Sequence, residues 1–390
     1  MATLASGQYG RYLVSLFSAP FLARALGAAG RGEFALFTSF ELLVVLVLGT
    51  GFTQSFGFEF RAARESAHEP DSIRQANGAV RVVWLRSVIA APVVGAVAFP
   101  LMGSTNALFL FLLTIGAPSA VIYGMHRQYL AVSHHDRQFA MLDALPALVF
   151  GLAVIALAVP NMLSMTVALI VLVATRWLRF LYGYRWWPSG AGTSSPTDGF
   201  RSYGYRAMPA TLAQFAQGSI AQFALLPSGT AAVGLFAVAQ LWASLLNPFY
   251  LAGGVRVFRS KSTTPEVPRL MLALFLPAGC LAVIGYFVVP WLFGEEFAPA
   301  APLAALLSVG SAGTGCFLVY RSVLDREGKP EVSSKVQLYY LLAILISVPA
   351  IVARVDLWIT AAVISALMLV RGVSIGILAH RLTRTYSRNS

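Results

Sequence analysis

Long apolar segments follow one another along nearly the whole chain, separated by short polar connections. A helix of about 20 apolar residues is long enough to cross the hydrocarbon core of a bilayer. The pattern therefore predicts an all-α integral membrane protein with twelve transmembrane helices, although ten would keep the same parity. The expected helices lie at 5–26, 35–58, 81–101, 107–131, 140–159, 163–184, 204–226, 231–256, 268–291, 301–324, 333–352 and 357–380.

The basic residues gather in every second connection between these helices. Cytoplasmic connections of membrane proteins carry an excess of Lys and Arg. With an even number of helices, both termini are expected in the cytoplasm, in a multi-pass protein of the plasma (inner) membrane. The basic set comprises Arg61, Arg64, Arg74 and Arg81; Arg127 and Arg137; Arg179, Arg185 and Arg201; Arg256, Arg259, Lys261 and Arg269; Arg326, Lys329 and Lys335; and Arg381, Arg384 and Arg388.

Composition changes how the net charge is interpreted. Only 11% of residues are charged and 57% are hydrophobic, whereas soluble domains carry about 25% charged residues. The net charge of +12 is thus explained by cytoplasmic connections rather than by a nucleic-acid partner. Cys280 and Cys316 lie in apolar segments as inert thiols. No phosphate-binding loop, zinc motif or Cys pair occurs, so we expect no cofactor, no metal and no enzymatic activity.

A linker-like segment divides the chain near its middle. Residues 188–199 (PSGAGTSSPTDG) are rich in Gly, Pro and Ser, a composition typical of flexible connections. This predicts an N-terminal six-helix half at 1–187 and a C-terminal six-helix half at 200–390.

Short sequence matches relate the two predicted halves. GEFA at 32–35 corresponds to GLFA at 234–237, and YGRY at 9–12 corresponds to YGYR at 203–206. Six helices per half imply a parallel repeat about an axis along the membrane normal, an arrangement that places substrate between the repeats.

Polar residues form stripes on equivalent helices of the two halves. Positions three, four and seven apart share one helix face. Such stripes fit a shared wet cavity, or equally interhelical hydrogen bonds of about 1 kcal/mol each that only pack the bundle. The stripes are Arg11, Ser15 and Ser18; Thr38 and Glu41; Thr211, Gln214, Gly218 and Gln222, with Gln217 at the edge; and Gln240, Ser244 and Asn247.

Three ionisable residues inside predicted helices are candidates for function, because charge is costly there. Arg11 and Arg206 occupy matching places in the repeat, and arginine suits phosphate oxygens; the alternative is snorkelling to the surface. Glu41 is the candidate for ion coupling; its alternative is a salt bridge to an arginine. By contrast, Asp143 is expected near the cytoplasmic boundary of the membrane. Four further residues are expected at the same boundary, in contact with lipid headgroups: Arg176, Arg321, Asp325 and Arg371.

Two segments carry a resemblance to a known family. The run from Arg11 to Phe34, with ARALG at 23–27 and GRGEF at 30–34, resembles the start of bacterial polysaccharide flippases. LFGEEFAPAAPL at 292–303 and GKP at 328–330 resemble that family's segments around its tenth helix. The family belongs to the multidrug/oligosaccharidyl-lipid/polysaccharide exporter (MOP) superfamily.

The resemblance implies a V-shaped pair of six-helix bundles, with helices one, two, seven and eight lining a cationic cavity. It implies a polyprenyl-diphosphate-linked oligosaccharide as cargo, flipped from the inner to the outer leaflet for cell-surface polysaccharide biosynthesis. Glu41 would couple transport to protons or sodium, and a polysaccharide polymerase and glycosyltransferases would be partners. The residues expected to bind diphosphate and sugar are Arg11, Arg24, Arg206, Ser15, Gln214, Gln217, Gln240 and Asn247.

Two other functions stay open at this point. The same fold could export cationic drugs, although an arginine-rich cavity argues against that cargo. A membrane enzyme or scaffold of the polysaccharide pathway is the alternative of a different class.

Overall fold

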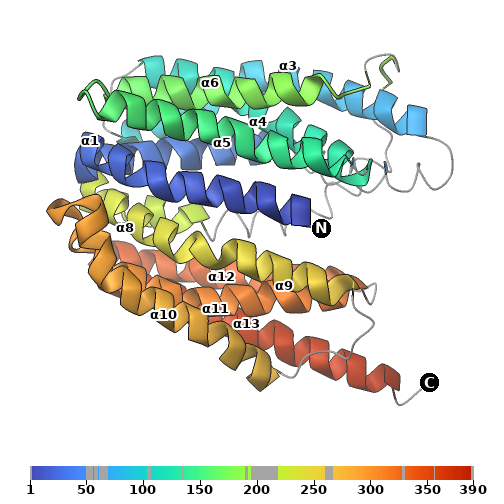
Figure 1. Cartoon of the computed structure of the whole chain (residues 1–390), viewed down its shortest axis with the longest axis vertical. Coiled ribbons are helices and arrows are strands. Elements are labelled where there is room, and N and C mark those ends of the chain that lie inside the picture. Colours follow the sequence, from blue (N-terminus) through green and yellow to red (C-terminus); the bar gives the residue numbers. More distant parts are fainter. Residues whose placement is uncertain are drawn as a thin grey trace. The chain divides into compact units, whose positions relative to one another are not determined.

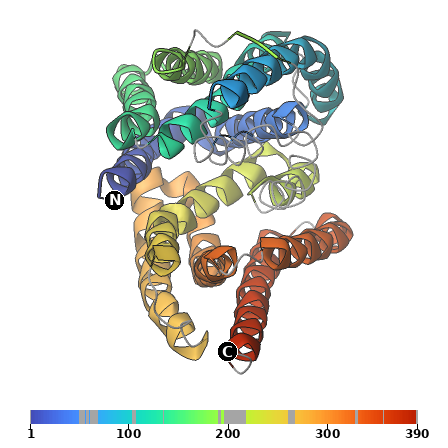
Figure 2. The same cartoon turned by 90° about the vertical axis from the view of Figure 1, so that its right-hand side faces the viewer.

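Every regular element that the structure describes is helical. The computed structural model contains eleven α-helices and three short 3-10 turns in its described part, with no strand there (Figures 1 and 2). The predicted all-α class is confirmed. The described residues are 2–49, 56, 60, 69–102, 107–133, 135–188, 192–194, 218–259, 267–326, 330–354 and 356–387.

Eight helices in the described part are long and apolar enough to cross a membrane. The chain is therefore a multi-pass membrane protein. The count of twelve spans and the cytoplasmic location of both termini stay predictions.

The first two expected helices form one kinked helix. α1 (Ala2–Gly49) is 48 residues long and changes direction at Gly27, where φ is 67° and ψ is 178°. Glycine adopts this positive φ without the steric cost that a Cβ imposes. The connection expected at 27–34 was therefore wrong, because the helix resumes directly after Gly27. The predicted end at 58 lies outside the described residues.

A carboxylate caps the helix where it resumes. The Oε1 atom of Glu296 accepts a hydrogen bond from the backbone N–H of Ala28 at 2.8 Å. The first N–H groups of a helix have no partner within it, and a negative charge there is favoured by the helix dipole. Glu296 thus stabilises the kink at Gly27.

The chain divides into two compact units. The first comprises residues 1–26 and 33–212, and the second comprises 27–32 and 213–390. The short segment after the kink of α1 therefore packs with the second unit. The predicted linker at 188–199 stays a prediction, since residues 195–217 lie outside the described part.

Four further helices belong to the first unit: α3 (Glu69–Met102), α4 (Ala107–Val132), α5 (Asp136–Ala158) and α6 (Met165–Tyr184). α4 lies against α3, α5 and α6. The expected start of the third helix at 81 was too late, because α3 already begins at Glu69. Side chains such as Ile73 and Ala76 are buried there, so packing extends the helix beyond the apolar span.

The second unit contains α8 (Thr230–Ala243), α9 (Asn247–Arg259), α10 (Val267–Phe293), α11 (Ala300–Arg326), α12 (Pro330–Arg354) and α13 (Leu357–Ser387). The eighth expected helix, 231–256, is interrupted by a 3-10 turn at Ser244–Leu246. Pro248 has no N–H to donate to the carbonyl of Ser244, which explains the interruption. Of the seventh expected helix, only 218–224 is described, and it is helical.

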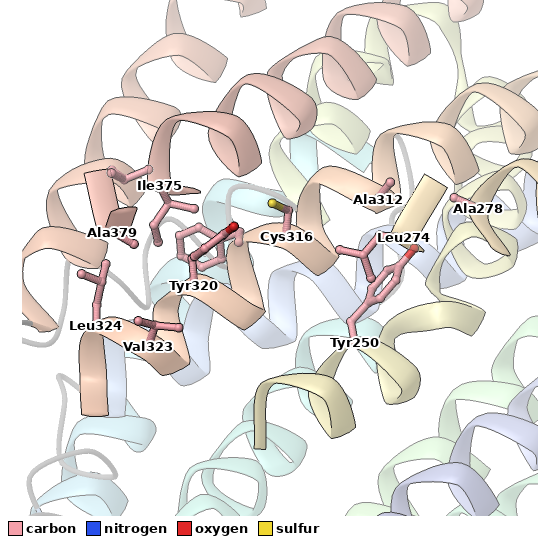
Figure 3. Close-up of a cluster of buried hydrophobic side chains, with 12 residues drawn as sticks. Tyr250, Leu274, Ala278, Ala312, Cys316, Tyr320, Val323, Leu324, Ile375 and Ala379 are labelled. Carbon is pink, nitrogen blue, oxygen red and sulfur yellow. The ribbon is translucent and has the colours of Figure 1, made fainter. Parts of the chain in front are cut away.

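α11 is the centre of the second unit and contacts α8, α9, α10 and α13. Its glycines allow that packing: a Cβ on Gly313 would lie 2.2 Å from the carbonyl oxygen of Met368 in α13. Gly310 and Gly315 are packed in the same way, since a Cβ there would lie 2.7 Å from Ser365 and 2.6 Å from Tyr250. Figure 3 shows the adjoining core, in which Tyr250, Cys316 and Tyr320 are fully buried.

The glycines of the sequence repeat meet each other within the second unit. A Cβ on Gly32 would lie 1.8 Å from the carbonyl oxygen of Thr230, and one on Gly234 would lie 2.0 Å from that of Ala28. Gly32 and Gly234 occupy equivalent positions of the repeat, and each contacts the carbonyl of the residue four positions before the other glycine. This reciprocal contact supports the repeat that the GEFA and GLFA segments predict.

Candidate functional site

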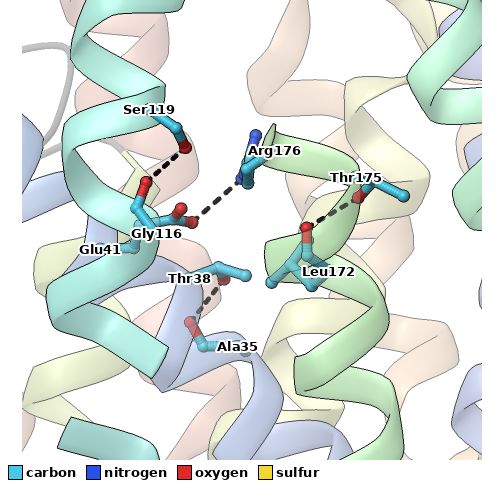
Figure 4. A network of polar contacts seen from close by, with 8 residues as sticks. All are labelled: Ala35, Thr38, Glu41, Gly116, Ser119, Leu172, Thr175 and Arg176. Carbon is cyan, nitrogen blue, oxygen red and sulfur yellow. Dashed lines mark hydrogen bonds and ion pairs between the residues drawn. The ribbon is translucent and has the colours of Figure 1, made fainter. Parts of the chain in front are cut away.

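A buried ion pair joins α1 and α6 in the first unit (Figure 4). A guanidinium nitrogen of Arg176 lies 3.1 Å from Oε2 of Glu41. The Glu41 side chain is 3% exposed and that of Arg176 is 23% exposed. Of the two alternatives for Glu41, the structure thus shows the salt bridge. Ion coupling by Glu41 stays a prediction.

The neighbouring hydroxyls do not bind this ion pair. Thr38, Ser119 and Thr175 each donate to a carbonyl of their own helix. Within the described part, Oε1 of Glu41 and Nε of Arg176 have no hydrogen-bond partner. A buried polar atom without a partner is costly, so this pair retains capacity for a proton, an ion or a ligand group.

A second charged cluster lies among α4, α5 and α6. Asp143 accepts a hydrogen bond from the Tyr123 hydroxyl, and its Oδ2 forms an ion pair with Nε of Arg127 at 3.4 Å. The guanidinium carbon of Arg179 lies 5.2 Å from the centroid of the Tyr123 ring, a favourable cation–π distance. We call Tyr123, Arg127, Asp143 and Arg179 the α4–α6 cluster.

Arg11 approaches the α4–α6 cluster from the first turns of α1. A Cβ on Gly10 would be 3.8 Å from Ala144, the residue after Asp143. Arg11 is exposed and close enough to Tyr123 and Arg179 for its charge to act on both. The structure therefore places one predicted binding residue beside buried charges that the sequence analysis assigned to the membrane boundary.

Arginines outnumber carboxylates among these groups. In the described part of the chain, the four arginines at this site are Arg11, Arg127, Arg176 and Arg179, and the two carboxylates are Glu41 and Asp143. Each carboxylate is paired with one arginine, Glu41 with Arg176 and Asp143 with Arg127. No carboxylate in the described part is paired with Arg11 or Arg179, so arginines are in excess over carboxylates at this site, from its buried part to its exposed edge.

Two further predicted binding residues, Arg24 and Ser15, lie in α1 at different distances from Arg11. Arg24 is exposed and lies 13 residues after Arg11, which is about 20 Å along a helix. One diphosphate cannot contact both at once. Ser15 is half-buried in α1, and its neighbour Ser18 donates to the carbonyl of Val14 at 2.8 Å.

The predicted residues of the second half are only partly described. Gln240 is half-buried and its Oε1 accepts a hydrogen bond from Nε2 of Gln222 at 2.7 Å. Asn247 is half-buried at the start of α9. The hydrogen bond between Gln222 and Gln240 is an interhelical contact, which was one of the two explanations offered for the polar stripes. Arg206, Gln214 and Gln217 lie outside the described residues.

Headgroup contact, which the sequence analysis expected for Arg371, was wrong, because this residue is buried inside the protein. Asp143 is 1% exposed, Arg179 is 8% exposed and Arg371 is 3% exposed. Arg371 lies between the rings of Phe317 and Tyr340, at 4.6 and 4.5 Å from their centroids. The spacing of Arg176 and Arg179, which share a face of α6, was the signal that could have placed them inside.

The fold is shared with solved transporters. An inward-facing multidrug resistance MATE family transporter of the MOP superfamily is 13% identical, with a TM-score of 0.72 over 97% of this chain and 96% of that one. An outward-facing MATE family transporter of this superfamily is 12% identical, with a TM-score of 0.69 over 100% and 95%.

A third solved structure differs in its pocket. It is a MOP superfamily transporter from Pyrococcus furiosus Vc1, whose binding pocket has reverse polarity that suggests a different function. It is 14% identical, with a TM-score of 0.60 over 97% of this chain and 93% of that one. No protein-family model matches the chain, and no curated protein matches it by sequence. These likenesses show that the chain shares the fold of these solved transporters.

Proposed function

We propose that this protein is an alternating-access transporter that flips a polyprenyl-diphosphate-linked oligosaccharide from the inner to the outer leaflet. The MOP superfamily fold and the multi-pass architecture support the transporter class. The nature of the cargo is argued from charge. The observation that carries it is the excess of arginines over carboxylates around the α4–α6 cluster and the Glu41–Arg176 pair.

Arginine is chemically suited to a diphosphate. The planar guanidinium donates two parallel hydrogen bonds to phosphate oxygens and keeps its charge when partly buried. Without compensation, moving a charged headgroup through hydrocarbon is strongly unfavourable. An electropositive interior lowers that barrier for an anion and raises it for a cationic drug.

Arg11 and Arg179 are the arginines that we assign to the cargo. Neither is paired with a carboxylate in the described part of the chain, and Nε of Arg179 has no acceptor there. Arg127 and Arg176 are partly neutralised by Asp143 and Glu41. A diphosphate beside Arg11 and Arg179 would accept from the Nε donor of Arg179 that the protein itself leaves unsatisfied.

Glu41 offers a route for coupling. A proton on Glu41, or a cation at its Oε1 atom, would weaken its attraction for Arg176. Arg176 would then become available to the anionic cargo, so that ion entry and cargo binding favour each other. This coupling is a proposal that rests on the unfilled Oε1 position.

Multidrug export is the second candidate function. It is favoured by the solved neighbours, which include multidrug resistance transporters. The Pyrococcus furiosus protein indicates that pocket polarity can differ within one fold. We therefore expect charge at the site, rather than the fold, to decide between these candidates.

Binding of the purified protein to three probes distinguishes the flippase from the multidrug exporter. We expect undecaprenyl diphosphate to bind more tightly than uncharged undecaprenol, and the cation tetraphenylphosphonium to bind weakest. Arg11→Gln and Arg179→Gln should each weaken diphosphate binding about 10- to 100-fold, the range for a charge-assisted hydrogen bond. Arg137→Gln, at an exposed position of α5, should bind as the wild type does.

Two results would reject the proposal. Tighter binding of tetraphenylphosphonium than of the diphosphate would assign the protein to drug export. Equal diphosphate binding by wild type, Arg11→Gln and Arg179→Gln would show that these two arginines do not bind the cargo.

A further inference from the structure

An apolar groove runs between α12 and α13 in the second unit. Its volume is about 750 Å³, within the range of about 300–1,000 Å³ typical of ligand pockets. The walls are almost entirely hydrocarbon. They include Val336, Tyr339, Ala343, Val370 and Leu378.

Cations mark one end of the groove. Lys335, near the start of α12, and Arg381, near the end of α13, both line it and are both exposed. Their connections belong to the basic set that the charge pattern assigns to the cytoplasm. The apolar part of the groove therefore begins at the depth of the cytoplasmic headgroups and continues toward the bilayer interior.

A third cation lies deeper beside the groove. Arg371 precedes Arg381 by ten residues, which is about 15 Å along a helix. It is buried, donates to Oγ1 of Thr314 at 3.0 Å, and lies against the ring of Tyr340. No carboxylate is among the described residues that line the groove, whereas Lys335, Arg371 and Arg381 all line it.

We propose that this groove binds one anionic phospholipid, with its phosphate between Lys335 and Arg381 and an acyl chain along the apolar walls. Charge complementarity selects this occupant. A soluble anion would make no use of the hydrocarbon walls, and a neutral lipid would make no use of the cations. The groove contains none of the residues assigned to the cargo, so the site does not depend on the proposed function.

Lipid titration of the full-length protein tests the site. The protein is depleted of lipid in neutral detergent, and binding of phosphatidylglycerol and phosphatidylcholine with identical chains is measured by native mass spectrometry. We expect phosphatidylglycerol to bind more tightly at one site. The double variant Lys335→Ala/Arg381→Ala should weaken that binding about 25-fold, since each cation near an anionic headgroup contributes about fivefold.

Two further variants separate the groove from general surface charge. Ala343→Trp fills the groove without changing its charge and should weaken binding of both lipids. Arg137→Ala removes an exposed cation from the first unit and should leave the tight site unchanged. Size-exclusion chromatography confirms that each variant is folded.

Three outcomes would overturn the assignment. Equal affinity for phosphatidylglycerol and phosphatidylcholine would show that Lys335 and Arg381 do not select an anionic lipid. Unchanged phosphatidylglycerol binding in Lys335→Ala/Arg381→Ala would place the tight site elsewhere. Tighter binding of undecaprenyl phosphate than of phosphatidylglycerol, lost in the same double variant, would assign the groove to a prenyl lipid.

Discussion

The interior of the first unit and the core around α11 in the second unit differ in the charge that they bury. Glu41, Asp143 and Arg179 are buried in the first, whereas Arg371 is the buried charge beside α11 among the described residues. In the first unit, charged side chains from α1, α4, α5 and α6 face one another, and several of their polar atoms lack partners in the described part. Around α11, backbones approach closely at Gly313 and Gly372. There the hydroxyl of Ser311 donates to the carbonyl of Ser308 at 2.6 Å.

This difference indicates a division of roles. Close backbone packing around α11 stabilises the fold and leaves little space for a ligand. The charged interior of the first unit is costly to maintain, and its unsatisfied atoms retain the capacity to bind. We therefore expect substitutions around α11 to change folding, and substitutions in the first unit to change function as well.

The largest expected effect is at Gly313 in α11. Gly313→Leu places side-chain atoms where the carbonyl of Met368 lies, 2.2 Å from a Cβ. Overpacking of well-packed cores costs about 1–3 kcal/mol and more where the backbone must move. We expect no monodisperse protein by fluorescence-detected size-exclusion chromatography.

The matched control is Gly279→Ala in α10. Nothing lies within 4 Å of a Cβ at Gly279, so this variant should purify as the wild type does. A Gly313→Leu protein with a wild-type elution profile and melting temperature would show that the packing around α11 is not essential.

The next effect is at the buried ion pair. Arg176→Met leaves the carboxylate of Glu41 buried without its partner, and such a change costs about 3–5 kcal/mol. Glu41→Gln combined with Arg176→Met removes both charges and should recover most of the lost stability, as measured by the melting temperature in detergent.

The double variant also separates stability from function. It should remain folded but lose any dependence of transport on an imposed proton or sodium gradient. A folded double variant with unchanged gradient dependence would contradict the coupling role of Glu41.

The smallest effect is at the cap of the kink in α1. Glu296→Ala removes the acceptor for the Ala28 N–H and should destabilise the protein by about 1 kcal/mol, as the loss of a helix cap does. Glu295→Ala, at an exposed neighbouring position, is the control.

Glu296→Ala tests a carboxylate that only caps a helix, in contrast to Glu41, to which we assign a role in coupling. Diphosphate binding should be the same in wild type and Glu296→Ala at a temperature where both are folded. A large loss of binding without a shift in melting temperature would place Glu296 in the functional site.

The sequence predicted the helical architecture better than the site. Spans such as 107–131 and 163–184 coincide closely with α4 and α6, because apolar length is a property of the segment itself. The continuity of α1 through 28–34 and the early start of α3 were missed. Both depend on tertiary contacts, such as Glu296 with Ala28 and the burial of Ile73.

Charge near a helix end was harder to interpret. Arg176, Arg179 and Asp143 follow the charge pattern of cytoplasmic boundaries, yet in the structure they face neighbouring helices. The pattern gives depth along the membrane normal but not the direction in which a side chain points. Arg11 was singled out from its position in the repeat, whereas Tyr123 and Asp143 come together only through the packing of α4 against α5.

The most direct test of the central claim is lipid analysis of cells that lack this protein. Lipids are extracted and analysed by mass spectrometry for polyprenyl-diphosphate oligosaccharides, with re-expression of the wild type and of Arg179→Gln as comparison. We expect a complete, unpolymerised unit to accumulate in the inner leaflet and to be cleared by the wild type only. An unchanged lipid pool, accompanied by increased sensitivity to cationic drugs, would contradict the account.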